Sequence, residues 1–153
     1  MTIFEHIIAG DLPASFVHRD ADCVAFMDIH PITRGHVLVV PRQPAETIGE
    51  LGPELRAHLW ETAHRVGQAQ QRALGSRAQH MLLNDGRAAS QTVPHVHVHV
   101  IPRYGRDHAR ALVRIAWHIT TLALPTRESP ARRRRLDADA AAIAAALAAP
   151  RPG

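Results

Sequence analysis

The sequence of 153 residues predicts an α+β fold, in which a mostly antiparallel sheet carries a long helix on one face. Several short β-branched runs are separated by turn residues, which is typical of strands. One longer segment, residues 53–74, repeats its apolar residues at helical spacing, and residues 95–100 alternate strictly between two residue types. We expect a single domain over residues 1–148 with a C-terminal helix, followed by a disordered tail over 149–153.

The amino-terminal third predicts a short helix and three strands. Residues 3–13 begin with an amphipathic pattern that stops at Gly10, as a short helix does. Residues 16–19 and 23–27 are strand-like and are separated by a polar Asp-Ala-Asp turn, which predicts a hairpin. Residues 36–41 form a β-branched run that predicts a buried strand.

The remaining elements follow from spacing and from helix end signals. The long helix is expected to begin at Pro53, whose fixed φ suits a first helical position, and to stop at Gly75. Residues 79–84 predict another strand. Beyond Arg103 the pattern is weaker, and we expect an extended segment over residues 114–124 and an alanine-rich helix over 137–147.

The alternating run at residues 95–100 reads His-Val-His-Val-His-Val. Successive side chains of a strand point to opposite faces, so three imidazoles share one face and three valines the other. The valine face can be buried in a core. Imidazoles titrate near pH 6.5 and serve as acid, base, nucleophile or metal ligand, so the histidine face predicts a functional site.

Composition excludes some classes of protein. The chain is 46% hydrophobic and 21% charged, as globular proteins are, and no apolar run approaches the ~18 residues of a membrane span. The amino terminus lacks the features of a signal peptide. The lone Cys23 cannot form an internal disulfide, which agrees with a cytoplasmic location.

Basic charge alone does not predict nucleic-acid binding. Lys+Arg minus Asp+Glu is 18 − 14 = +4, and every one of these basic residues is arginine. Nucleic-acid binding needs basic residues clustered on one surface. The four arginines at 132–135 precede the expected helix and oppose its dipole, so we interpret them as a solvated linker.

The histidine run and its flanks resemble the histidine-triad (HIT) family of nucleotide hydrolases and transferases. The family pattern His-φ-His-φ-His-φ-φ, with φ apolar, matches residues 95–101. The segments 84–86 (Asn-Asp-Gly), 91–93 (Gln-Thr-Val) and 101–103 (Ile-Pro-Arg) are similar to the family's flanks. Five upstream segments resemble its amino-terminal half: 3–4, 7–10, 12–14, 25–29 and 35–41. The resemblance covers roughly residues 3 to 103 and implies a HIT-like fold.

By this resemblance, four histidines carry the chemistry. His97 is implied to be the nucleophile, which attacks an α-phosphorus and forms a nucleotidyl-histidine that water hydrolyses. In the family, a backbone carbonyl accepts from its other nitrogen and fixes the tautomer. His99 is implied to contact a phosphate oxygen. His95 is implied to orient the site by hydrogen bonding, with His36, the fourth histidine, as the expected partner.

The resemblance also implies a set of substrate-binding residues. Asp28 is implied to accept hydrogen bonds from both ribose hydroxyls, with the capping of a turn as its alternative role. Asn84, Gln91 and Thr92 are implied to lie on the phosphate side. An apolar slot for a purine, for which ordinary core packing is the alternative, is implied to be lined by Phe4, Ile7, Leu12, Phe26 and Ile29.

One departure concerns zinc. Many relatives carry a Cys-x-x-Cys that binds structural zinc, and the matching positions here are Thr2 and Glu5. A thiolate zinc site is therefore excluded, and we expect no required cofactor and no metal. A zinc ion held by Glu5, His36 and His95 is the alternative.

Within the family, Asn84 favours AMP release from adenosine phosphoramidates. The flanks Gln-Thr-Val and Val-Ile-Pro-Arg are nearer to the alternative, a dinucleoside polyphosphate (Ap3A/Ap4A) hydrolase or phosphorylase. A metal-binding protein or a non-catalytic nucleotide-binding protein are alternatives from other classes. The expected partners are a purine nucleotide and a second copy of the chain, which pairs through the long helix and the adjoining sheet edge. Neither a membrane nor nucleic acid is expected as a partner.

Overall fold

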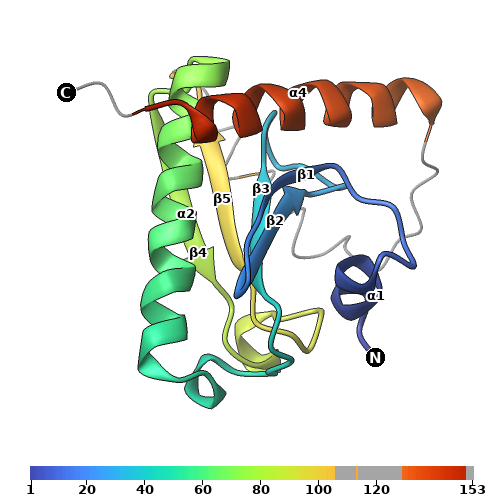
Figure 1. Cartoon of the computed structure of the whole chain (residues 1–153), viewed down its shortest axis with the longest axis vertical. Helices are drawn as coiled ribbons and strands as arrows, with labels where there is room; N and C mark the ends of the chain where they lie inside the picture. The colour runs from blue at the N-terminus through green and yellow to red at the C-terminus, as the bar shows by residue number, and fades with distance from the viewer. Residues whose placement is uncertain (106–112, 114–128, 151–153) are drawn as a thin grey trace.

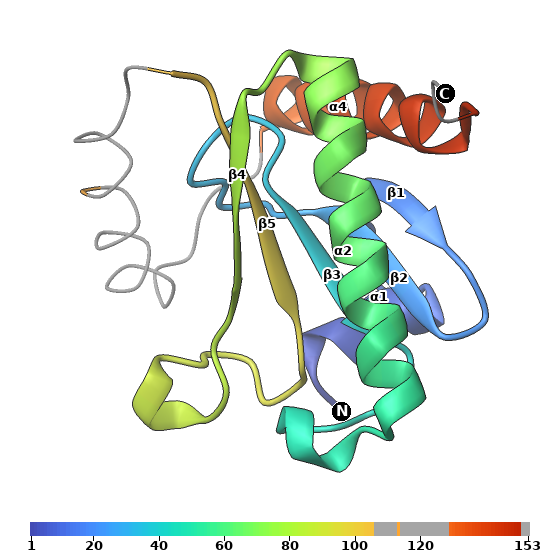
Figure 2. The same ribbon diagram turned by 90° about the vertical axis from the view of Figure 1, so that its left-hand side faces the viewer.

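A five-stranded antiparallel sheet forms the centre of the molecule, and helices cover both of its faces (Figures 1 and 2). The computed structural model describes residues 1–105, 113 and 129–150. The strand order is β1-β2-β3-β5-β4. The strands are β1 (Phe16–Arg19), β2 (Cys23–Met27), β3 (Val37–Pro41), β4 (Ala78–Leu83) and β5 (Val98–Arg103). The α+β class and the antiparallel sheet are therefore confirmed.

The helices begin and end at residues that favour helix starts and helix stops. The described helices are α1 (Ile3–Ala9), α2 (Pro53–Leu74) and α4 (Pro130–Ala148), with short 3-10 turns η1 (Ile48–Glu50) and η2 (Arg87–Ala89). Helix α1 ends at Gly10 and α2 at Gly75, with φ of 90° and 72°. Only glycine adopts this left-handed conformation without a steric cost, which explains both stops.

The two faces of the sheet pack against different helices. Alternate residues of β3 divide between them: Val37 and Val39 join the core under α2 and α4, whereas Leu38 and Val40 join a smaller cluster with Phe4 of α1. This alternation follows from the two-residue period of a strand. Figure 2 shows α2 lying along the sheet, with α1 behind it.

Helix α4 starts earlier than the sequence analysis expected. It begins at Pro130 rather than Asp137, so residues 132–135 form its first turns and the linker interpretation is wrong. Ser129 accepts a hydrogen bond from the Arg132 backbone N–H, and proline suits the first helical position, so Ser129-Pro130 is a start signal. Packing of the helix against α2 and β1 outweighs the unfavourable dipole.

Other differences are small. Strand β3 begins one residue after His36, and β4 runs one residue earlier than expected. The expected segment over residues 114–124 and the tail residues 151–153 lie outside the described residues. In the part of the chain that the structure describes, no helix has the length and apolar character needed to cross a membrane.

Candidate active site

Strand β5 and the residues just before it place the histidines. Val96, Val98 and Val100 lie in the core under α2, so the alternation of the run is preserved although the regular strand begins only at Val98. His97 and His99 point to the opposite face, with their ring centroids 4.9 Å apart. The ring of Phe4 from α1 packs edge-on against His97. The two imidazoles are therefore neighbours on a wall that α1 faces.

The ring of His97 is held in one tautomer by its own backbone. Its Nδ1 donates to the His95 carbonyl oxygen at 2.8 Å, which leaves Nε2 with the lone pair. Burial lowers the pKa of His97 below its ordinary value, although the His95 carbonyl and the charge of Asp28 act in the opposite direction. His97 is thus a neutral base or nucleophile at pH 7.

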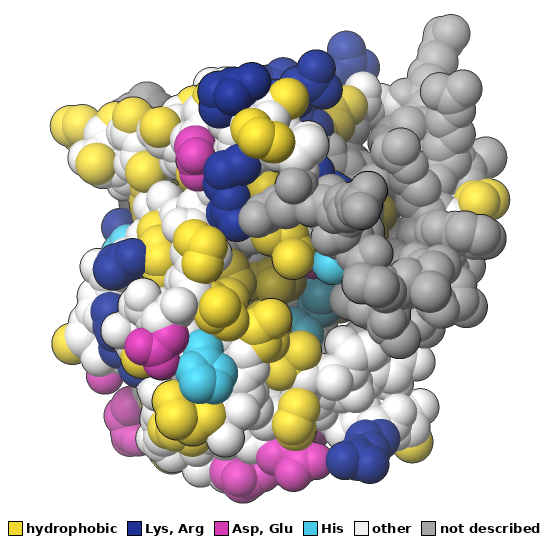
Figure 3. Space-filling model, turned by 90° about the vertical axis from the view of Figure 1, so that its right-hand side faces the viewer, with side chains coloured by type: hydrophobic (Ala, Val, Ile, Leu, Met, Phe, Trp, Pro, Cys, Tyr) yellow, Lys and Arg dark blue, Asp and Glu magenta, His cyan; other side chains and the backbone are white. Residues whose placement is uncertain are grey.

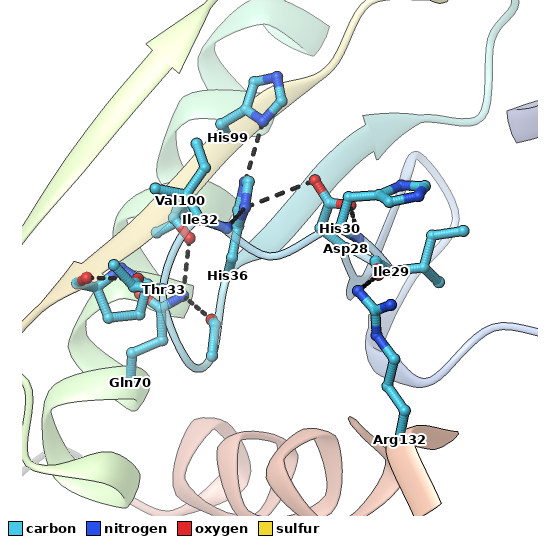
Figure 4. A network of polar contacts seen from close by, with 12 residues as sticks. Asp28, Ile29, His30, Ile32, Thr33, His36, Gln70, His99, Val100 and Arg132 are labelled. Carbon is cyan, nitrogen blue, oxygen red and sulfur yellow. Dashed lines mark hydrogen bonds and ion pairs between the residues drawn. The ribbon is translucent and has the colours of Figure 1, made fainter. Parts of the chain in front are cut away.

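His99 is held in the complementary tautomer by a chain of hydrogen bonds (Figure 4). The Ile32 backbone N–H points at His36 Nδ1 at 3.3 Å, so this nitrogen accepts in the neutral ring. We therefore assign the proton of His36 to Nε2, which lies 3.0 Å from His99 Nδ1 and donates to it. The remaining nitrogen of His99 then carries a proton. Neighbouring rings thus offer a lone pair and an N–H donor.

The prediction that His36 hydrogen-bonds to His95 is wrong. The His36 ring bonds to His99, and the His95 ring bonds to other groups. His95 Nε2 donates to the Pro41 carbonyl oxygen at 2.9 Å, and its Nδ1 lies 3.4 Å from the Thr2 hydroxyl. His95 is fully buried. It therefore ties the triad to the end of β3 and to the start of α1, and it acts through its backbone carbonyl on His97.

A cavity of about 660 Å³ lies between this wall and α1. Figure 3 shows histidine side chains inside a hollow bordered by hydrophobic side chains. The predicted residues that line it are Phe4, Ile7, Leu12, Phe26, Asp28, Ile29, Asn84, Thr92, His97 and His99. Its size and mostly apolar lining, with a few convergent polar groups, suit a nucleotide-sized ligand.

Asp28 lies at the end of β2 and is almost fully buried. One carboxylate oxygen accepts from the His30 backbone N–H at 2.8 Å, so the turn-capping role is present. The other oxygen lies 3.5 Å from His36 Nδ1. Asp28 therefore caps the turn and also lines the cavity.

Gln91 is not placed as a substrate-binding residue. Its Oε1 accepts from the Gly86 backbone N–H at 2.6 Å, and its Nε2 donates to the Glu46 carbonyl at 2.8 Å. Gln91 does not line the cavity, whereas the adjacent Thr92 does. The two polar ends of the Gln91 amide therefore hold the loop between β4 and β5 in place. This loop carries Asn84 and Thr92, which both line the cavity.

Sequence reasoning missed two kinds of cavity residue. Leu38 and Leu82 both pair with His99 in register on the neighbouring strands, so strand alternation could have found them. Arg133 reaches the cavity from α4, more than a hundred residues from Asp28 along the chain. The Ser129-Pro130 start signal places Arg133 in the first turns of the helix and was the available clue.

The comparisons with known proteins agree with this architecture. A family model described as the HIT domain matches residues 9–106. An uncharacterised HIT-like protein of Mycobacterium tuberculosis is 40% identical over 105 residues, which cover 69% of this chain and 73% of the relative. This chain belongs to the histidine-triad family. A zinc-bound histidine-triad protein of Mycobacterium smegmatis superposes with a TM-score of 0.75 at 31% identity, covering 95% of this chain and 92% of that one.

Two relatives with named activities bear on function. The adenosine 5′-monophosphoramidase hnt1 of Schizosaccharomyces pombe is 36% identical over 106 residues, which cover 69% of this chain and 77% of the relative. An asymmetrical bis(5′-nucleosyl)-tetraphosphatase of the same organism is 39% identical over 90 residues, covering 59% of this chain and half of that protein. This chain therefore shares its family with nucleotide hydrolases.

The residues at the start of α1 do not fit a structural zinc ion. Thr2 and Glu5 form a capping box: the Thr2 backbone N–H donates to the Glu5 carboxylate at 2.6 Å, and Thr2 Oγ accepts from the Glu5 N–H at 3.3 Å. Both ring nitrogens of His95 are already hydrogen-bonded. His36 bonds to His99, so its ring does not fit a Glu5–His36–His95 zinc set. We call the hydrogen-bonded group Thr2–Glu5–His95 the clasp.

Among the described residues, one group has the spacing of metal ligands. Ligand atoms of Asp28, His36 and His99 lie within 4.8 Å of one another, and all three are buried. The rings of His36 and His99 are hydrogen-bonded to each other at 3.0 Å, however, so a metal ion would have to replace that hydrogen bond.

Proposed function

We propose that the protein hydrolyses purine nucleoside phosphoramidates, with His97 as nucleophile, and releases a nucleoside monophosphate such as AMP. The observation that carries this proposal is the pair of neighbouring imidazoles on one cavity wall, whose hydrogen bonds assign a lone pair to His97 and an N–H to His99. A nucleophile next to a donor that stabilises developing negative charge is the arrangement that phosphoryl substitution requires.

In the first step, His97 Nε2 forms a bond to the α-phosphorus while the phosphorus–nitrogen bond of the substrate breaks. The amine leaves with the electron pair of that bond and takes up a proton from the solvent. The imidazole gives the nucleotidyl-histidine, and the His99 N–H donates to a phosphate oxygen. In the second step, water adds its oxygen to phosphorus and gives up a proton to the solvent. The phosphorus–His97 bond breaks, its electron pair returns to Nε2, and the monophosphate is released.

The nucleoside is positioned by the other end of the cavity. The buried carboxylate of Asp28 offers two acceptor oxygens, which suits a pair of ribose hydroxyls. Apolar side chains of α1 and β2, including Phe4 and Phe26, provide the surface for a base. Asn84 and Thr92 supply neutral polar groups on the phosphate side.

The observations on the leaving group favour the phosphoramidate and leave one alternative. Asn84 and the monophosphoramidase relative support the phosphoramidate. The alternative is a dinucleoside polyphosphate, supported by the Gln-Thr-Val flank and by the tetraphosphatase relative. Both substrates contain an α-phosphorus that His97 can attack, so the nucleophile is the same in either case.

Several further properties belong to this proposal. We propose a cytoplasmic enzyme that requires no cofactor. A homodimer is supported by β4, an edge strand with half-buried side chains, and by Trp60 of α2, which is 38% exposed. Light scattering at the mass of a monomer would refute the dimer.

The testing experiment compares steady-state hydrolysis of adenosine phosphoramidate with that of diadenosine tri- and tetraphosphate, before and after prolonged chelation. We expect the phosphoramidate to be cleaved fastest, with no loss of rate after chelation. Faster cleavage of the polyphosphates would select the alternative substrate. Loss of activity on chelation would select a metal-dependent protein, and no turnover with retained AMP binding would select a non-catalytic one.

A further inference from the structure

One arginine of α4 reaches the cavity that we assign to the nucleotide. Arg133 lines it together with Leu12, Ala14 and Ile29, which offer apolar side chains. Figure 3 shows arginine side chains gathered along the upper border of the hollow. A guanidinium carries five N–H donors and no acceptor, so it changes the chemistry of an otherwise apolar wall.

The position of Arg133 is fixed by its neighbours. Its Nη1 lies 3.4 Å from the Ser15 hydroxyl, which in turn donates to Asp137 at 2.6 Å. The preceding Arg132 donates through Nη2 to the Ile29 carbonyl oxygen (Figure 4). These contacts hold the first turns of α4 against Ser15 and against the Ile29 backbone at the cavity.

The order of groups along the cavity indicates which part of a nucleotide meets Arg133. This step rests on the proposed function, in which the phosphate lies at His97 and His99 and the ribose at Asp28. Ile29 follows Asp28 directly, and Ser15 pairs through its backbone carbonyl with Met27 N–H at 2.9 Å. Arg133 contacts Ser15, and its neighbour Arg132 bonds to the Ile29 carbonyl, so Arg133 lies on the nucleoside side rather than at the nucleophile.

We propose that Arg133 is a specificity-determining residue that selects 6-oxopurine nucleotides over adenine nucleotides. Guanine and hypoxanthine present two adjacent acceptors, N7 and O6, which match the paired donors of a guanidinium. Adenine presents N7 as an acceptor but an N6 amino donor beside it, which a donor-only group cannot satisfy. The protein accepts purines in general, and Arg133 ranks them.

The experiment measures calorimetric dissociation constants for AMP, GMP and IMP. The proteins are the wild type, Arg133→Ala, Arg133→Gln and the control Arg134→Ala, whose side chain is exposed on the same helix turn. We expect the wild type to bind GMP and IMP about tenfold more tightly than AMP. Arg133→Ala removes the preference, and Arg134→Ala keeps it. Arg133→Gln favours AMP, because an amide pairs with adenine N6 and N7.

Two results would reject the role of Arg133 without affecting the proposed function. One is equal affinity of the wild type for all three nucleotides, and the other is an equal loss of affinity for all three in Arg133→Ala. Circular dichroism checks the fold of each variant, and Arg133→Gln carries the test if the alanine variant does not fold. Binding of none of the three would overturn the proposed function as well. Hydrolysis of guanosine and adenosine phosphoramidates at equal kcat/KM would leave that function intact and reject the role of Arg133.

Discussion

The two faces of β5 and of His97, the residue just before it, differ in what they bury and in what they leave reachable. On one face, Val98 and Val100 are completely buried under α2. On the other, His97 and His99 are nearly buried by the walls of a cavity, yet they line it. Low exposure alone therefore does not separate core from site, because a polar group with fixed hydrogen bonds beside a cavity is also shielded from bulk water. The comparison predicts that changes on the two faces have different consequences.

The largest effect is expected for His97→Ala. Removing the nucleophile should lower turnover by at least about 10³-fold while AMP binding and thermal stability change little. The matched control is His64→Ala, an exposed histidine of α2, which should keep full activity. Steady-state kinetics and calorimetric AMP binding measure both quantities, and near-normal turnover of His97→Ala would reject it as the nucleophile.

The pH dependence of the first chemical step should follow the neutral form of His97. Burial lowers its pKa from 6.5, so the ring stays neutral, and the step stays fast, to a pH below 6.5. Below the lowered pKa the rate should fall about tenfold per pH unit. Single-turnover formation of the nucleotidyl-enzyme measures this limb, and a midpoint at or above 6.5 would contradict the effect of burial.

On the other face, Val98→Ala should act on stability. The substitution removes two methyl groups from a fully buried position and should lower the free energy of unfolding by about 2 kcal/mol. The kcat of the protein that remains folded should be close to that of the wild type. Urea unfolding and activity at low temperature measure the two quantities. A large fall in kcat without a loss of stability would contradict the prediction that the valine face contributes to stability and not to catalysis.

Asp28→Ala should weaken nucleotide binding about tenfold through the lost ribose hydrogen bonds. The loss should be smaller for 2′-deoxy nucleotides, because they offer one hydroxyl fewer. Calorimetry with AMP and 2′-deoxy-AMP measures the difference. An equal loss for the two would remove Asp28 from ribose recognition and leave it the turn-capping role.

The smallest effect is expected at the clasp. Thr2→Ala removes the cap of α1 and the hydroxyl near His95, which should cost about 1 kcal/mol of stability. Thr2→Ser keeps the hydroxyl and should be near wild type. Thermal unfolding with and without added zinc measures both variants, and stabilisation of the wild type by zinc would contradict the poor fit of these residues to the metal.

The elements and the site differ in how much the sequence could predict. Local signals such as Pro53, Gly75 and the alternation at residues 95–100 act within a few residues, and the structure confirms the elements they indicate. The partner of His36 depends on how β3 and β5 align, which no local signal encodes. Leu38 pairs with His99 in register, and this register sets His36 beside His99. The role of Arg133 likewise depends on where α4 packs.

The hydrogen bond from His97 Nδ1 to the His95 carbonyl has an evolutionary consequence. The acceptor is a main-chain atom two residues away, so no side-chain replacement at residue 95 can delete it. A different side chain there can weaken the attachment to β3 and α1 and still leave the nucleophile in its tautomer. The orientation of the reactive nitrogen is thus robust to point mutation, and the surrounding residues are free to diverge toward new substrates.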